Sequence, residues 1–223
     1  MNTIEMHNIV KSYDGLNNVL SSLNFTLDKG EFVSILGRSG AGKSTLLNII
    51  GLLDSPTSGD YYLEGKAIPH KLTHKIRNEY FGFIYQLYNL LPNLTVYRNL
   101  MIPLLYSTKT IYRNYQNNLI NITKKLMIAN LLNTKVDLLS GGEKQRVAIA
   151  RAMMLSPSVL IADEPTGSLD DENAERICNI LRDYANNGNG VIVVTHNKNV
   201  AQYADNSYLL QEGKLTSYDI CKM

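Results

Sequence analysis

FVSIL at residues 32–36 runs directly into GRSGAGKS at residues 37–44. The first five residues form a short, continuous apolar run, which is typical of a strand buried on both faces. The residues from Ser44 to Gly51 then predict an apolar helix. A strand, a glycine-rich loop and a helix in this order form the context that the P-loop pattern requires. The stretch therefore predicts an α/β fold with a phosphate-binding loop.

The residue types in this loop suit the binding of a nucleoside triphosphate. Glycines let backbone N–H groups turn toward phosphate oxygens, and the following helix presents the positive end of its dipole. Lys43 supplies a positive charge for the β- and γ-phosphates, and the Ser44 hydroxyl can bind Mg²⁺. We expect contacts with ATP from Gly37, Arg38, Ser39, Gly40, Ala41, Gly42, Lys43, Ser44 and Thr45. A glycine-rich turn without a ligand would account for the glycines but not for the whole pattern.

A second apolar strand, VLIAD at residues 159–163, ends in the carboxylates of Asp163 and Glu164. Taken alone, such a pair is most often a solvated turn or the start of a helix. Behind a P-loop, Asp163 is placed to hold Mg²⁺ through water, and Glu164 to orient or deprotonate the attacking water. We therefore expect Glu164 to be the general base of an ATP hydrolysis reaction.

The remaining pattern predicts strands and helices in an α/β rhythm. Strands are expected at residues 3–10 and 19–27, with Asp28-Lys29-Gly30 closing a hairpin. Another hairpin is expected at residues 60–66 and a strand at residues 191–195. Residues 95–132 carry Leu and Ile at helical spacing, which indicates a helical insertion, and residues 171–184 predict a further helix.

The composition limits the classes of function. The 223 residues carry a formal net charge of +2, and Lys and Arg are spread along the chain, so a nucleic-acid partner is not expected. The two cysteines have no metal-like spacing, and a reducing cytoplasm is the simpler assumption. The N-terminus shows no signal peptide, and the apolar runs are too short to cross a bilayer. We expect any membrane role to act through a partner.

The segment LSGGEKQR at residues 139–146 separates the families of P-loop proteins. Ser140, Gly141 and Gly142 precede an apolar helix that continues through residues 147–154, so they form a second anion-binding helix N-terminus. A serine-capped helix would explain Ser140 but not the whole string. The segment resembles the signature sequence of ABC ATPases, and the resemblance covers nearly the whole chain.

This resemblance implies a P-loop NTPase of the ABC ATPase fold: a RecA-like core, an antiparallel β subdomain and a helical subdomain. It implies one ABC ATP-binding domain over residues 1–223, with a helical insertion at about residues 87–155. In such proteins the signature faces the P-loop of a second copy, so that two ATP molecules lie in a head-to-tail homodimer. The resemblance therefore places Ser140, Gly141 and Gly142 against the γ-phosphate that the partner's P-loop holds.

The same resemblance assigns roles to further residues. Gln86 matches the Q-loop glutamine, which contacts Mg²⁺ or the water and senses the membrane subunit. His196 matches the switch histidine at the γ-phosphate, and residues 168–170 match the D-loop across the dimer contact. Tyr13 matches the aromatic residue that stacks on adenine, although a tyrosine at a strand end is commonly structural. The expected catalytic set is Glu164, His196, Gln86 and Lys43, and the expected Mg²⁺ set is Ser44, Gln86 and Asp163.

Within the family, the chain is most similar to the MacB/LolD-like group, whose membrane partners export or extract peptides, antibiotics or lipoproteins. The similar stretches are residues 51–59, 89–95, 102–106 and 163–170. Two residues depart from the expected pattern: Val136 stands where a proline is expected, and Asn197 stands where an aspartate usually follows the histidine. Neither is among the expected phosphate contacts, so the departures concern the substrate group more than the ATPase.

These observations predict an ATPase subunit, peripheral at the cytoplasmic face of the cell membrane, that powers a separate integral membrane permease for export of a peptide, antibiotic or lipid-linked substrate. A groove for a short permease helix is expected where apolar residues follow Gln86: Leu87, Tyr88, Leu90, Leu91, Tyr97 and Leu100. The first alternative is an FtsE-like ATPase that regulates a membrane partner in cell division. A second alternative is a soluble ABC ATPase of translation or DNA repair. The chain has only one P-loop and no sustained heptad pattern, and both features argue against this class. A third alternative is a binding module that holds ATP without cleaving it.

Overall fold

The structure is a computed structural model that describes residues 2–69, 74–107, 115–167 and 169–219. Its strands form two sheets. The first is antiparallel, in the order β2-β1-β4-β5, with β1 Asn2–Ser12, β2 Asn18–Asp28, β4 Ser58–Leu63 and β5 Lys66–Ala67. The second has the order β10-β9-β3-β8-β7-β6, with β3 Phe32–Leu36, β6 Phe81–Ile84, β7 Val159–Asp163, β8 Gly190–Thr195, β9 Asn206–Gln211 and β10 Lys214–Ser217.

The expected hairpin closed by Asp28-Lys29-Gly30 is wrong. The turn is present, but β3 pairs with β8 and β9 and makes no pair with β2, so the chain crosses here from the first sheet to the second. The hairpin of this region is instead formed by β1 and β2, which pair antiparallel around residues 13–17. A glycine turn after a strand signals a change of direction, but it does not say which strand the chain will pair with next.

Strands β9, β3, β8, β7 and β6 run parallel, and β10 joins antiparallel at one edge. The central strands β3 and β8 are buried at every residue, as the continuous apolar run at residues 32–36 predicts. Successive side chains of a strand point to opposite faces, so each strand supplies two hydrophobic cores. Val33 and Ile35 belong to one core, and Phe32 belongs to the other.

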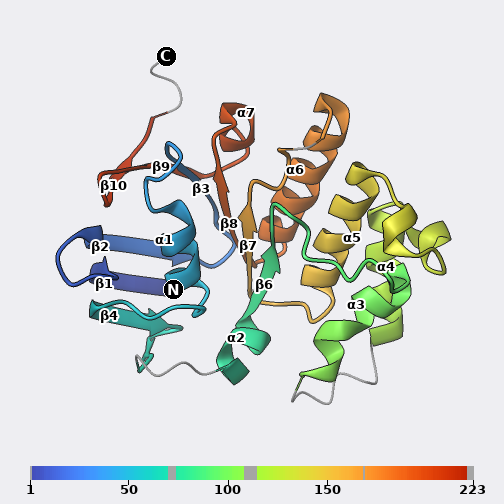
Figure 1. Cartoon of the computed structure of the whole chain (residues 1–223), viewed down its shortest axis with the longest axis horizontal. Coiled ribbons are helices and arrows are strands. Elements are labelled where there is room, and N and C mark those ends of the chain that lie inside the picture. Colours follow the sequence, from blue (N-terminus) through green and yellow to red (C-terminus); the bar gives the residue numbers. More distant parts are fainter. Residues whose placement is uncertain (1, 70–73, 108–114, 168, 220–223) are drawn as a thin grey trace.

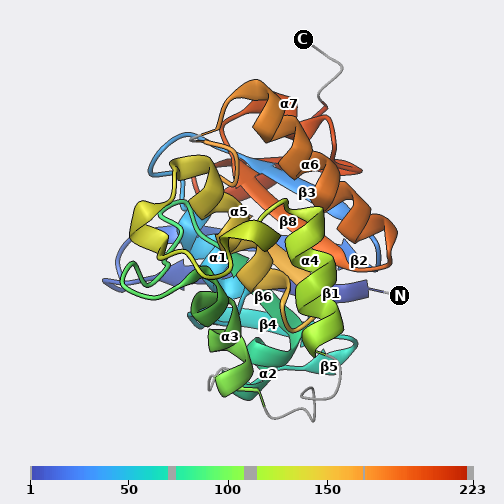
Figure 2. The same cartoon turned by 90° about the vertical axis from the view of Figure 1, so that its right-hand side faces the viewer.

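The two cores lie between different layers. One fills the space between the six-stranded sheet, the antiparallel sheet and α1, Lys43–Ile50; the other lies between the opposite face and the helices α3 to α6. Figure 1 shows α1 and the antiparallel sheet on one side of the central strands and these four helices on the other. In Figure 2, turned by 90°, these helices face the viewer.

The helices α3, α4 and α5 lie in the chain between β6 and β7. Thr95 caps α3 by accepting a hydrogen bond from the Arg98 N–H, and Ser140 caps α5. The bounds are α2 His74–Tyr80, α3 Val96–Leu105, α4 Tyr115–Lys125, α5 Gly141–Met153, α6 Asp171–Asn186 and α7 Lys198–Ala201, with short 3₁₀ turns η2 Ala129–Leu131 and η3 Val136–Leu138. Within the described residues, no helix is long and apolar enough to cross a membrane.

The two departures from the family pattern have local explanations. The backbone N–H of Val136 donates to the Leu94 carbonyl at 3.0 Å, a hydrogen bond that a proline could not make. The Asn197 side chain accepts from the Asn199 N–H at 2.9 Å and so caps α7, a task that an aspartate could also perform. Both residues therefore serve the local backbone.

A buried pair of hydroxyls at the centre of the sheet offers a test of the core. Ser34 on β3 and Ser207 on β9 lie 2.7 Å apart, oxygen to oxygen, and both are buried. We predict that Ser34→Ala lowers the free energy of unfolding by about 1–3 kcal/mol, because the Ser207 hydroxyl is left buried without its partner. The double variant Ser34→Ala with Ser207→Ala should recover much of that loss. Urea unfolding of the four proteins measures this, and additive losses would contradict it.

Candidate ATP-binding and hydrolysis site

Four parallel strands end at the same edge of the sheet and deliver the expected site residues there. The P-loop follows β3, His196 follows β8, Asp163 and Glu164 end or follow β7, and Gln86 comes after β6. One cavity of about 550 Å³ is lined by Val19 and by Gly37, Arg38, Ser39, Gly40, Gly42, Lys43, Ser44, Thr45, Gln86, Asp163, Glu164 and His196. Ligands of open α/β sheets bind at this edge, outside the carboxyl ends of the strands.

The P-loop backbone is shaped for the approach of an anion. Gly42 has a φ of 95° and is the N-cap residue of α1. A Cβ atom on Gly42 would also lie only 3.2 Å from the Val19 carbonyl oxygen, so both conformation and space favour glycine here. The Lys43 ammonium donates to the carbonyls of Gly37 at 2.7 Å and Arg38 at 3.0 Å. This curls the lysine back over its own loop and brings a positive charge to the cavity.

The Glu164 carboxylate is held at both oxygens. Oε2 accepts a hydrogen bond from the Thr195 hydroxyl at 2.9 Å, and Oε1 accepts from the backbone N–H of His196 at 2.9 Å. The His196 Nδ1 lies 2.7 Å from the same Oε1 and donates when it carries the proton. Glu164 is only 9% exposed, while the His196 side chain is 74% exposed. The expected base is therefore fixed in place, and the expected switch residue reaches from it into the open cavity.

Asp163 lies beside Glu164 at the end of β7. Burial, together with the negative charge of Glu164, raises the pKa of the Asp163 carboxyl, and the positive charge of Lys43 partly opposes this rise. A carboxylate in this situation gains from a cation placed against it. Asp163, Ser44 and Gln86 all line the P-loop cavity. This donor set of hydroxyl, carboxylate and amide oxygens suits Mg²⁺, which prefers oxygen ligands.

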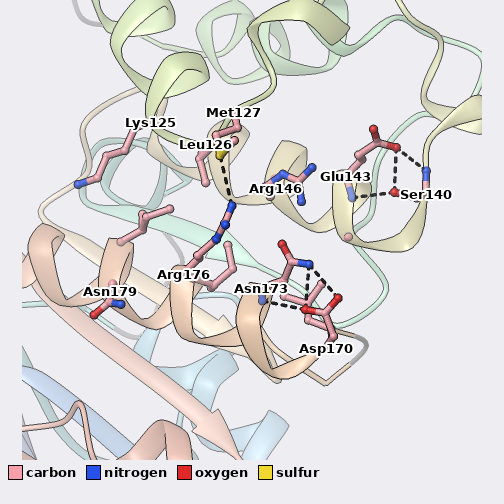
Figure 3. A pocket seen from close by; sticks show the side chains of 14 residues that line it. Lys125, Leu126, Met127, Ser140, Glu143, Arg146, Asp170, Asn173, Arg176 and Asn179 are labelled. Carbon is pink, nitrogen blue, oxygen red and sulfur yellow. Dashed lines mark hydrogen bonds between the residues drawn. The ribbon is translucent and has the colours of Figure 1, made fainter.

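The signature residues lie elsewhere in the chain. Ser140 accepts a hydrogen bond from the Glu143 N–H at 3.3 Å, and the Glu143 carboxylate accepts from the Ser140 N–H and hydroxyl, both at 2.8 Å. These hydrogen bonds lower the pKa of Glu143. Ser140 and Gly142 line a different cavity of about 940 Å³. Figure 3 shows Ser140 and Glu143 on one wall, with Asp170 and Asn173 of the α6 N-terminus opposite.

The structure therefore brings most of the expected residues together, but not all. Gly141 and the two other signature residues do not line the P-loop cavity. Ala41 lines a neighbouring cavity on the P-loop together with Gly213. Of the expected D-loop, Asp170 caps α6 by accepting from the Asn173 N–H at 2.8 Å, while Ser168 lies outside the described residues.

Tyr13, the residue expected at adenine, also lies outside the P-loop cavity. Its ring is 64% exposed, but its hydroxyl donates to the Asp54 carboxylate at 2.9 Å. The Lys11 ammonium lies 4.7 Å from the centre of the ring and 2.8 Å from Asp54. Tyr13 thus belongs to a small cluster with two charged residues, and its stacking on adenine stays a prediction.

The fold and the site define an ATP-binding cassette, and the comparisons with known proteins agree. The ABC transporter family matches residues 20–167, and the chain belongs to this family. The chain is 36% identical to MJ0796, a bacterial ABC transporter cassette solved as a dimer, with a TM-score of 0.85 over 97% of this chain and 98% of that one. A post-hydrolysis dimer of MJ0796 bound to ADP and Pi gives the same TM-score at 34% identity.

Among proteins of named function, the chain is similar to macrolide export ATP-binding/permease proteins called MacB. It is 41% identical to the one from Pectobacterium atrosepticum, over 88% of this chain and 31% of that protein. It is 40% identical to the one from Haemophilus ducreyi, over 96% of this chain and 32% of that protein. The chain thus spans about a third of the length of these relatives.

The comparisons settle several of the predictions. The ABC ATPase class, its fold with a RecA-like core and the similarity to the MacB/LolD-like group are confirmed, and the FtsE-like alternative is not favoured. The roles of individual site residues stay predictions. Thr195, whose hydroxyl donates to the Glu164 carboxylate, was not among the expected site residues. A threonine at the end of an apolar strand, as Thr195 is in β8, gives only a weak signal, because threonine is common in strands.

The raised pKa of Asp163 gives a prediction with a definite sign. The folded protein holds this proton more tightly than the unfolded chain, so stability is lost as pH rises from the ordinary value of 3.8 through the raised pKa. We predict that Asp163→Asn raises the melting temperature at pH 7 in the absence of nucleotide. A gain of about 1 kcal/mol in the free energy of unfolding would raise it by roughly 2–4 °C. The difference should shrink as the pH falls through the raised pKa, because the wild-type carboxyl then takes up its proton and loses its charge as well.

The same variant should lose the extra melting temperature that ATP with Mg²⁺ gives the wild-type protein, because the cation then lacks its carboxylate. Thermal unfolding with ATP alone, and with ATP plus Mg²⁺, separates the two effects. A variant that is less stable without nucleotide at pH 7 would show that Asp163 is not destabilising in the fold.

Proposed function

We propose that this chain hydrolyses ATP as part of a head-to-tail homodimer that powers a membrane permease, and that the transported substrate is a peptide, an antibiotic or a lipid-linked molecule. The observation that carries the proposal is the division of the site. The P-loop, Asp163, Glu164, Gln86 and His196 share one cavity, whereas the signature Ser140 lines another. A second copy would supply the missing half to each cavity.

The comparisons support this arrangement. The MJ0796 cassette, which matches almost the whole chain, is dimeric, and its post-hydrolysis form holds ADP and Pi. The MacB relatives are named for macrolide export and carry a permease. From the chemistry of the residues, ATP would be held by the P-loop amides and Lys43, with Mg²⁺ near Ser44, Gln86 and Asp163. The bound cation would neutralise phosphate charge.

The chain's own residues would then act on the attacking water. Glu164 accepts a proton from water as general base, and the hydrogen bonds from Thr195 and the His196 N–H keep its carboxylate oriented. The His196 side chain is 74% exposed, so its ring can turn from Glu164 toward the γ-phosphate by giving up its hydrogen bond with the Glu164 carboxylate. Gln86, exposed at the edge of the same cavity, would report the γ-phosphate to the segment that follows it.

The base is tested by Glu164→Gln. We predict a loss of steady-state ATP hydrolysis of about 10²–10⁴-fold, because only the activation of water is removed. ATP binding should persist, and the variant should accumulate as an ATP-bound dimer in size-exclusion chromatography. A variant that hydrolyses ATP normally, or that stays monomeric with ATP, would show that this role is wrong.

Two further changes serve as controls for the shared site. Lys43→Ala should weaken ATP binding by the monomer itself, since Lys43 belongs to the chain's own P-loop cavity. Ser140→Arg in the Glu164→Gln background should bind ATP as a monomer but fail to dimerise. Equal loss of monomer affinity in both variants would argue against a site shared between two copies.

The permease contact is proposed at the residues after Gln86. Leu87 is 82% exposed and Leu91 is 49% exposed, which leaves apolar surface on the segment that follows Gln86. Two other members of the expected groove are not available, because Leu100 is fully buried and Leu90 packs against the core of the helices, whereas Tyr97 is 38% exposed. The surface that could receive a short helix of the permease is therefore narrower than the sequence suggests.

We predict that Leu87→Asp together with Leu91→Asp breaks the complex with the permease while basal ATPase activity survives, because both side chains already contact solvent. Leu90→Asp should instead destabilise the fold by roughly 2–5 kcal/mol, because it places a charge against the core. Co-purification, ATPase rate and thermal unfolding of each variant measure the difference. A complex that persists in the double variant would exclude this surface as the docking site.

A further inference from the structure

Arg151 connects the helix α5 to the segment that follows Gln86. Its guanidinium donates to the Asn89 carbonyl at 2.5 Å and to the Tyr88 carbonyl at 2.9 Å. Tyr88 and Asn89 have φ values of 59° and 49°, in the left-handed region that residues other than glycine rarely adopt. Two such residues in succession need support from their surroundings, and the Arg151 fork provides it.

The segment is held at both ends, and Gln86 lies between the two attachments. On one side, Ile84 is the buried last residue of β6. On the other, only the exposed Leu87 separates Gln86 from the two carbonyls that Arg151 binds. A displacement of Gln86 toward the γ-phosphate therefore reaches the Arg151 contact within two residues.

A second attachment fixes the far end of the segment to α3. The buried Asn99 side chain accepts from the Leu91 N–H at 2.8 Å and donates to the Leu91 carbonyl at 3.0 Å. The helices α3 and α5 pack against each other. Residues 88–91 are therefore attached to the helical layer by side chains from two helices.

The helix that carries Arg151 near its end also carries the signature at its start. Ser140 is the N-cap of α5, and Arg151 lies in its last turn. Tyr88 reaches the start of this helix as well, because a Cβ atom on Gly141 would lie 3.4 Å from the Tyr88 hydroxyl oxygen. Tyr88 thus lies against both ends of α5: its carbonyl accepts from Arg151, and its hydroxyl lies beside Gly141.

We propose that Arg151 is a positioning residue that couples Gln86 to the signature of the same chain. The inference rests on the proposed function, in which Gln86 responds to the chain's own nucleotide and Ser140 contacts the nucleotide of the second copy. Movement of Gln86 shifts the carbonyls of residues 88 and 89, and the bidentate guanidinium carries this shift into α5 as a whole. Each copy then presents its signature only when its own cavity is occupied.

The bidentate geometry explains why an arginine is needed. Lysine offers a single ammonium on a flexible stem and cannot span two successive carbonyls in a fixed plane. Methionine keeps much of the apolar stem but has no donor. Arg151→Lys and Arg151→Met therefore weaken the connection in graded steps. Arg98→Met is a matched control, because the Arg98 side chain is exposed on α3 and does not line the cavity of Ser140 or that of the P-loop.

The experiment uses the Glu164→Gln protein and measures the ATP concentration at which half of it is dimeric. Arg151→Met should raise this concentration by about tenfold, and Arg151→Lys by less, within the usual range of coupling between two sites. Arg98→Met should leave it unchanged. ATP affinity of the monomer, measured with Ser140→Arg added to prevent dimerisation, should be the same with and without the Arg151 change.

A double-mutant cycle with Gln86→Ala distinguishes coupling between Arg151 and Gln86 from a merely structural role of Arg151. If Arg151 carries the response of Gln86, the effect of both changes together on dimerisation will be close to that of either one alone. Additive effects would overturn the proposal, as would an Arg151→Met protein that dimerises at the unchanged ATP concentration. If the Arg151→Met protein does not fold, the same double-mutant cycle is measured with Arg151→Lys instead. Failure of the Glu164→Gln parent to dimerise would instead overturn the proposed function.

Discussion

The register of the parallel sheet is the constraint on which the rest of the site depends. Leu36 pairs with Thr195, Val194 with Asp163, and Ala162 with Ile84, so the ends of four strands are aligned within a residue or two. Both faces of β3 and β8 are buried in separate cores, and a slip by one residue would exchange their side chains between the cores. The hydrophobic packing of the strands therefore sets where the phosphate-binding loop, the carboxylates and the histidine meet.

The site places two carboxylates side by side at a partly buried strand end, which costs the fold stability. The cost is visible in the raised pKa of Asp163, and Lys43 offsets only part of it. Glu164 is stabilised differently, by hydrogen bonds from β8 and from the residue after it. The neighbouring carboxylates thus have different environments, as expected when one is to face a cation and the other a water molecule.

Much of this arrangement could be predicted from the sequence, because the P-loop, Asp163 and Glu164 each directly follow an apolar strand. Contacts between residues far apart in the chain could not be predicted. The carbonyls that Arg151 binds are 62 and 63 residues away, and Tyr13 meets Asp54 across 41 residues. Apolar composition also failed to separate Leu100, which is buried, from Leu87, which is exposed, since both lie in one apolar stretch. The turn after β2 was assigned to the wrong strand pair because local turn chemistry does not determine pairing.

The contrast between Leu90 and its neighbours has a consequence for how this family diversifies. Leu90 supports the packing of the helices, whereas Leu87 and Leu91 face solvent. Substitutions at exposed positions usually change stability by less than about 0.5 kcal/mol. Leu87 and Leu91, which follow the proposed sensor Gln86, can therefore vary with the shape and charge of a partner at little cost to stability. Duplicated copies of one cassette could in this way acquire separate partners while their chemistry stays the same.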